Sequence, residues 1–213
     1  MLELPIMTEV IYTAAKVFDN LQSDRLAAQS FIASGDTRGI TSRADLKLLK
    51  DLKDAAQVVI DCHNDSVALS PEIIVSINSA MTRSAALQPG KFRQDSDNIG
   101  VSTRFGDHRP TAVTTAALQW FIDDASHLPA KKAAATLFVS LAKAQPFGDG
   151  NKRTALLAAN LLLLPHSHVL TVPFSETDPE VSNKFSELLA RAYIYDEVKE
   201  CVEYMTSRCV ISF

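Results

Sequence analysis

A polar loop between two apolar segments holds the residues of this chain that are best suited to chemistry. The loop covers residues 145–153, after a run rich in Ala, Leu and Val (133–144) and before an apolar run (154–164). Apolar segments joined by a loop with a glycine on each side of Asp149 predict a helix, a loop and a second helix. The second helix is then expected to begin at residues 149–151.

The start of that second helix is suited to bind phosphate oxygens. Backbone N–H groups in the first turn of a helix have no partner within it, and the helix dipole places positive potential there. Lys152 and Arg153 add two cations, and Asp149 adds a carboxylate of the kind that holds Mg²⁺ beside phosphates. These residues predict a site for a nucleoside polyphosphate and Mg²⁺.

The same residues resemble the signature of the Fic/Doc (Fido) family, H-x-F-x-D/E-G/A-N-G/K-R. The chain matches it at Phe147 and at residues 149–153, but has Gln145 in place of the histidine. Many Fic proteins have a second arginine three residues after the first, where this chain has Leu156, and residues 151–156 are similar to Doc-type members. The resemblance implies an all-α fold, a Fido-type helical bundle with a small β-hairpin flap.

The resemblance also implies an activity and a role for each motif residue. The activity is the transfer of AMP or phosphate to a hydroxyl of a protein target, from ATP or another nucleoside triphosphate with Mg²⁺. Asp149 would hold the metal, and Gly150, Asn151 and Lys152 would form the anion nest. Arg153 would clamp phosphate. Lys152 looks Doc-like and Gly150 looks Fic-like, so the group transferred stays open.

Gln145 weakens the expectation of an active enzyme. In the family the histidine is the general base, and glutamine can hydrogen-bond a hydroxyl but cannot accept its proton near neutral pH. A general base contributes about 10²–10⁴ in rate, whereas positioning and charge stabilisation dominate phosphoryl transfer. We therefore expect Gln145 to position the nucleophile in a slow enzyme, with Phe147 anchoring the loop. The alternative is a catalytically silent Fido module that binds nucleotide or a protein partner, as in a toxin–antitoxin-like pair.

One segment departs from the helical pattern of the chain. Residues 88–93 and 99–110 combine β-branched, aromatic and turn residues, which predicts a short hairpin. It resembles the flap of the family, a β-edge that holds a target segment by strand addition. The residues of this target-docking flap would be Ile99, Val101, Thr103, Arg104 and His108. For Arg104 and His108 we prefer the alternative that they belong to a solvated hairpin and carry incidental charge.

Self-inhibition in the family uses an S/T-x-x-x-E-G/N helix whose glutamate pairs with the second arginine. The nearest match, at residues 30–35, has Ser34 at the glutamate position, and Leu156 replaces the arginine. The usual clamp is therefore not expected.

The rest of the chain has mainly helical patterns. Apolar spacing and caps predict helices at 7–21, 24–33, 42–62, 70–81, 110–125, 129–144, 178–195 and 196–208, with a short extended piece at 169–172. We divide the chain into an N-terminal helical extension (1–51) and a Fido domain (52–213).

Composition limits the partners. The 213 residues are 46% hydrophobic and 22% charged, with a formal net charge of -4, which argues against nucleic-acid binding. Three cysteines without a C-x-x-C pair suggest reduced thiols, and neither a signal peptide nor a membrane-spanning run is evident. We expect a soluble cytoplasmic protein that has no membrane partner. Its expected partners are a nucleotide and a protein target at the flap, with an antitoxin or a second copy of the chain as further candidates.

Overall fold

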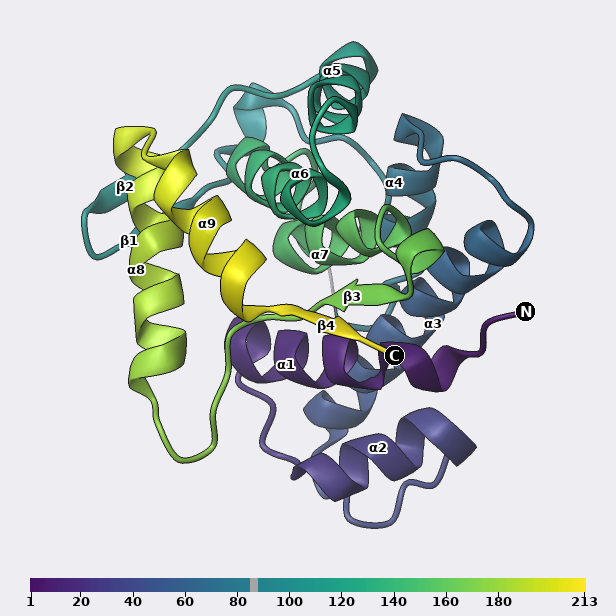
Figure 1. Cartoon of the computed structure of the whole chain (residues 1–213). Coiled ribbons are helices and arrows are strands. Elements are labelled where there is room, and N and C mark those ends of the chain that lie inside the picture. Colours follow the sequence, from purple (N-terminus) through teal and green to yellow (C-terminus); the bar gives the residue numbers. More distant parts are fainter. Residues whose placement is uncertain (85–87) are drawn as a thin grey trace.

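The computed structural model describes residues 1–84 and 88–213, and most of these residues are helical (Figure 1). The α-helices are α1 (Thr8–Asp19), α2 (Arg25–Ser34), α3 (Arg43–Asn64), α4 (Pro71–Ser79), α5 (Thr115–Ser126), α6 (Ala130–Ala144), α7 (Asn151–Leu161), α8 (Glu180–Tyr195) and α9 (Val198–Arg208). A 3₁₀ turn (Leu4–Met7) precedes α1. The predicted all-α bundle with a small β-hairpin is confirmed.

Side-chain caps determine where several helices begin. The hydroxyl of Ser42 accepts hydrogen bonds from the N–H groups at the start of α3, and Ser70 does the same for α4. The helix predicted from residue 110 begins only at Thr115, because Thr114 is its cap. The carbonyls of Pro110 and Thr111 instead accept hydrogen bonds from the Arg93 side chain, which keeps this stretch out of the helix.

Helices α6 and α7 form the centre of the molecule. α7 packs against α1, α3 and α4 on one side and α6 on the other, while α5 and α9 cover α6 (Figure 1). Every residue of α7 from Arg153 to its end is buried. Leu156 is fully buried among them, so the position of the family's second arginine is here part of the apolar core.

The strands are short and form two pairs. β1 (Val101–Thr103) and β2 (Gly106–His108) form an antiparallel hairpin. The predicted hairpin is thus confined to residues 101–108, and residues 88–93 do not join it, because Phe92 forms an isolated bridge with Phe147. β3 (His168–Leu170) corresponds to the predicted extended piece and pairs with β4 (Val210–Ser212), which was not predicted.

The N-terminal helices pack on the rest of the chain. α1 contacts both α3 and α7, and α3 itself runs through residue 51, where we divided the chain. That division stays a prediction. No helix in the described part of the chain is both long enough and apolar enough to cross a lipid bilayer.

Candidate functional site

The polar loop begins at the end of α6, where the backbone turns into the left-handed region at Gln145 (φ 47°). Gln145 is 3% exposed, and its N–H donates to the carbonyl of Leu141 at 3.1 Å. Its own carbonyl accepts from Nε of Arg93 at 2.6 Å. The backbone of Gln145 is therefore fixed on both sides, and the role of its side chain with a nucleophile stays a prediction.

Phe147 attaches the middle of the loop to the core. It is fully buried and stacks on Phe92, with the ring centres 5.6 Å apart. The N–H of Arg93 donates to the carbonyl of Pro146 at 3.0 Å. The segment that leads to the flap is thus joined directly to the polar loop, in agreement with the anchoring role expected for Phe147.

Two asparagine side chains hold the loop in shape. The side chain of Asn151 accepts from the N–H of Phe147 at 2.8 Å and donates to its carbonyl at 2.9 Å, which closes the loop over these residues. Asn78 of α4 donates to the carbonyl of Asp149 at 3.1 Å and to the hydroxyl of Thr154 at 2.9 Å. Asn78 was missed in the sequence, where the only signal is a polar residue on an apolar helix.

Free N–H groups mark the start of α7. The first hydrogen bond of the helical pattern runs from the N–H of Thr154 to the carbonyl of Gly150 at 2.8 Å, so the N–H groups of residues 151–153 have no acceptor inside the helix. Gly150 has φ 73°, and a Cβ there would lie 3.1 Å from Cε of Met81. Glycine thus permits both the turn and the close packing.

Carboxylates surround the buried arginine of the motif. Arg153 is 3% exposed, and its Nη1 donates to the hydroxyl of Ser84 at 3.1 Å. Its Nε lies 3.5 Å from Oδ2 of Asp19, the last residue of α1, and its Nη2 lies 3.7 Å from Oδ1 of Asp149. Two carboxylates therefore flank the guanidinium that was predicted to clamp phosphate.

Asp19 was not singled out in the sequence. Burial raises the pKa of its carboxyl group, while the neighbouring Arg153 and Lys152 act in the opposite direction. It differs from the family's inhibitory glutamate because it comes from α1 and contacts the first arginine of the motif. An anion that binds Arg153 must compete with this carboxylate.

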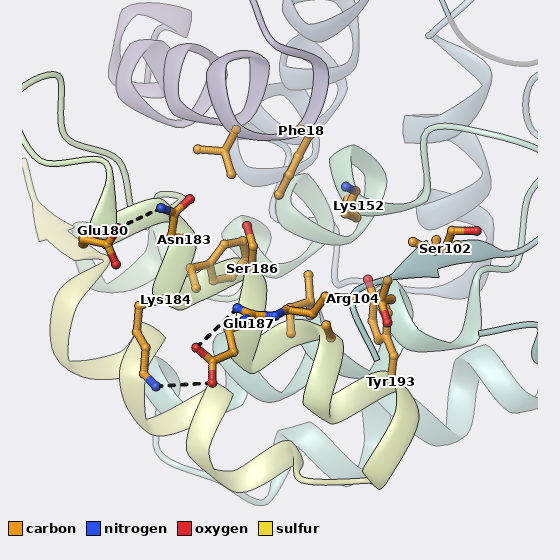
Figure 2. A pocket seen from close by; sticks show the side chains of 16 residues that line it. Phe18, Ser102, Arg104, Lys152, Glu180, Asn183, Lys184, Ser186, Glu187 and Tyr193 are labelled. Atoms are coloured by element: carbon orange, nitrogen blue, oxygen red, sulfur yellow. Dashed lines mark hydrogen bonds and ion pairs between the residues drawn. The ribbon is translucent and has the colours of Figure 1, made fainter. Parts of the chain in front are cut away.

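A pocket of about 580 Å³ opens beside the motif (Figure 2). Its walls come from the end of α1, strand β1, the start of α7 and α8. Among the predicted site residues it brings together Lys152, Val101, Thr103 and Arg104. Its described lining does not include Gln145, Asp149, Gly150, Asn151, Arg153, Ile99 or His108.

Lys152 connects the charged residues around Arg153 with this pocket. Its Nζ lies 5.0 Å from the centre of the Phe18 ring, and Figure 2 shows the two side chains next to each other. Burial lowers the pKa of Lys152, partly opposed by the negative charge of Asp19. Elsewhere on the pocket wall, Oε2 of Glu187 lies 3.8 Å from Nη1 of Arg104, and Oε1 of Glu187 lies 3.9 Å from Nζ of Lys184.

His108 packs and hydrogen-bonds within the protein. Its Nε2 lies 2.7 Å from the carbonyl oxygen of Lys143, and its ring stacks on that of Tyr193, with the ring centres 4.9 Å apart. A carbonyl can only accept, so Nε2 carries the hydrogen and donates it. Arg104 is more exposed (65% of its side chain) and lines the pocket. The docking role of the flap residues stays a prediction.

The residues present fit the expected Mg²⁺. In the described part of the chain no three His, Cys, Asp or Glu side chains gather as ligands. Mg²⁺ in nucleotide sites usually binds one or two carboxylates together with phosphate oxygens and water. Asp149, with 53% of its side chain exposed, is a suitable single carboxylate, and its Oδ1 accepts from the N–H of Gly150 at 2.5 Å.

Comparison with known proteins finds a family match in part of the chain. The profile of the Fic/DOC family matches residues 68–163. A Fic domain containing signaling protein from Bacteroides thetaiotaomicron VPI-5482 superposes with a TM-score of 0.73 at 16% identity, over 95% of this chain and 82% of that one. Fic-1 (residues 134–508) from C. elegans has a TM-score of 0.72 at 13% identity, and the match covers 98% of this chain and 64% of that one. A Fic family protein from Desulfovibrio desulfuricans G20 has a TM-score of 0.66 at 14% identity, and the match covers 95% of this chain and 62% of that one.

These identities show a common fold, and the chain spans less than two thirds of the length of the latter two structures. No curated protein matches the chain significantly. The family profile covers the polar loop, the flap and all of α7, where the motif residues have the geometry described above. Residues 68–163 therefore match the Fic/DOC family, in a chain whose fold is that of Fic domain proteins.

Proposed function

We propose that this protein transfers AMP or phosphate from a nucleoside triphosphate to a hydroxyl group of a protein target. The observation that carries the proposal is the start of α7. There, three N–H groups without helical acceptors and the cations of Lys152 and Arg153 lie beside a pocket of about 580 Å³. That volume is typical of small-molecule sites, which are roughly 300–1,000 Å³.

Each group has a physical task in this proposal. The N–H groups of residues 151–153 and the cations of Lys152 and Arg153 bind phosphate oxygens, while the pocket receives the nucleoside. Asp149 would hold Mg²⁺, which neutralises phosphate charge when bound. Gln145 donates or accepts a hydrogen bond to orient the attacking hydroxyl. A cytoplasmic setting, where nucleoside triphosphates are available, suits this activity.

The second candidate is a silent module that binds nucleotide or a protein partner without turnover. Two observations favour it: Gln145 cannot take a proton, and Asp19 and Asp149 already flank the charge of Arg153. The enzyme turns over nucleotide and the silent module does not, so incorporation of label from ATP distinguishes the two candidates.

We expect ATP or GTP to bind at the start of α7, more tightly with Mg²⁺, as measured by titration calorimetry. Arg153→Ala should weaken binding by about tenfold or more, because it removes charge-assisted hydrogen bonds to phosphate. Lys131→Ala, at an exposed position near the start of α6, is the control and should bind as the wild type does. If neither nucleotide binds at millimolar concentration, the proposed site is wrong.

We expect a proline at Ser102 to reduce target labelling while nucleotide affinity stays level. The hairpin turn has two residues, and Thr103 and Gly106 flank it as a hydrogen-bonded pair. Pairs alternate along an antiparallel hairpin, so the backbone N–H groups of the next pair, Ser102 and Asp107, point away from the partner strand. Ser102→Pro therefore removes a donor from the outer edge of β1, which lines the pocket, and leaves the backbone hydrogen bonds between the strands in place. Like the control below, it also removes the hydrogen bond from the hydroxyl of Ser102 to Oδ1 of Asp107.

Asp107→Pro is the matched control, because it removes the equivalent donor on the opposite edge. Labelling of lysate proteins and nucleotide titration are measured for both variants. Equal loss of labelling in both would show that the hairpin is structural, and unchanged labelling in Ser102→Pro would show that the target docks elsewhere.

A further inference from the structure

A fully buried carboxylate lies behind the phosphate-binding arginine. Asp51, in the middle of α3, has no exposed surface. Its carboxylate accepts hydrogen bonds from the N–H of Arg83 at 3.0 Å and the N–H of Ser84 at 2.6 Å. It also accepts from Nη1 of Arg83 at 3.1 Å and from the hydroxyl of Ser84 at 2.7 Å. Asp51 therefore fixes both the backbone and the side chain of Ser84.

The fixed hydroxyl of Ser84 faces Arg153. Its single hydrogen is donated to Asp51, so the contact of 3.1 Å with Nη1 of Arg153 is one in which the oxygen accepts. This partner is neutral, whereas the carboxylates of Asp19 and Asp149 offset the charge of the guanidinium. Ser84 can thus hold the guanidinium in place without cancelling the charge that attracts phosphate.

We infer that Asp51 and Ser84 are positioning residues that hold Arg153 in the orientation needed to bind the nucleotide phosphates. The inference rests on the proposed function and adds residues outside the motif to the site. Ser84 acts on Arg153 directly, and Asp51 acts through Ser84. Without the hydroxyl, the partners that the guanidinium keeps among the described residues are the carboxylates of Asp19 and Asp149, and it turns toward them, which makes it less available to phosphate.

The hydroxyl is more important for Arg153 than for Asp51. If the hydroxyl is removed, Asp51 still accepts from two backbone N–H groups and from the side chain of Arg83. The loop at residues 83–84 therefore keeps its attachment to α3. This difference allows the positioning role to be tested separately from stability.

The test compares Ser84→Thr with Ser84→Val, which have the same shape and differ in the hydroxyl. The probes are Mg²⁺–ATP, inorganic tripolyphosphate and adenosine, titrated into the whole chain. We expect Ser84→Val to bind ATP and tripolyphosphate about tenfold more weakly, the scale of one hydrogen bond to a charged group. Ser84→Thr should bind like the wild type, and adenosine affinity should be the same in all three proteins.

Two further variants complete the design. Ser84→Ala repeats the loss of the hydroxyl without the added methyl groups, in case both larger side chains disturb packing. Adding Asp19→Asn to Ser84→Ala should restore part of the tripolyphosphate affinity, because it removes the competing carboxylate.

The inference is overturned if the Val and Ala variants bind tripolyphosphate as the wild type does, or if adenosine affinity falls equally. A wild-type protein that binds neither ATP nor tripolyphosphate would overturn the proposed function together with this inference. A wild type that binds both, with unchanged Ser84 variants, would overturn the positioning role alone.

Discussion

Replacing Gln145 by histidine is expected to raise transfer of label from nucleotide to protein by as much as about 10²–10⁴-fold. The substitution restores a group that can take the proton of the attacking hydroxyl near neutral pH. The backbone permits the change, because histidine is among the residues that tolerate the left-handed conformation found at position 145 (φ 47°). The hydrogen bond from Arg93 to the carbonyl does not depend on the side chain and should persist.

The measurement is incorporation of label from α- and γ-labelled ATP into lysate proteins, which also distinguishes AMP transfer from phosphate transfer. Gln145→Asn is the matched control, since asparagine also tolerates this conformation but cannot accept a proton. The gain with histidine should increase with pH through about 6.5 as the imidazole loses its proton. If the histidine variant binds nucleotide but remains inert, the silent-module function is favoured.

Much of the fold could be predicted because its signals are local. Ser42 and Ser70 lie directly before apolar helical patterns, and both cap the helices that follow. The helix predicted from residue 110 was the exception. Arg93 holds Pro110 and Thr111 outside the helix. It lies 17 and 18 positions before these two residues, and no local sequence pattern reveals a contact over that distance.

The candidate site also has one part that the local sequence predicts and one part that only the fold reveals. The residues of the motif are contiguous, so their chemistry was readable from the loop itself. Asp19, Asp51 and Asn78 reach the motif only through the packing of α1, α3 and α4 on α7. A carboxylate on an amphipathic helix usually faces solvent, and nothing in one sequence distinguishes these from others. The tertiary structure was needed to find them.

Arg93 shows how the fold determines the shape of the site. It is 5% exposed, and its guanidinium donates to the carbonyls of Gln145 and Pro110 at 2.6 Å and of Thr111 at 2.9 Å. A cation at the carbonyl end of α6 also interacts favourably with the helix dipole. One side chain therefore joins the end of α6 to the segment that follows the flap.

Arg93→Ala is consequently expected to lower the free energy of unfolding by about 3–4 kcal/mol, because it leaves the buried carbonyl of Gln145 and the partly buried carbonyls of Pro110 and Thr111 without this donor. For a chain of this size that corresponds to a melting temperature lower by roughly 10 °C, measurable by calorimetry or circular dichroism. Arg93→Lys should recover only part of the loss, since a lysine cannot reproduce the planar fork of donors.

Arg109→Ala is the matched control for Arg93. Arg109 follows β2 and is 56% exposed, and its guanidinium contacts the side chains of Asn98 and Asp107. Exposed pairs of this kind contribute about 0–1 kcal/mol, so its loss should shift the melting temperature by only a few degrees. If Arg93→Ala is no more destabilising than Arg109→Ala, the buried arginine does not hold the loop. The geometry of Gln145 must then come from Phe147 and Asn151 instead.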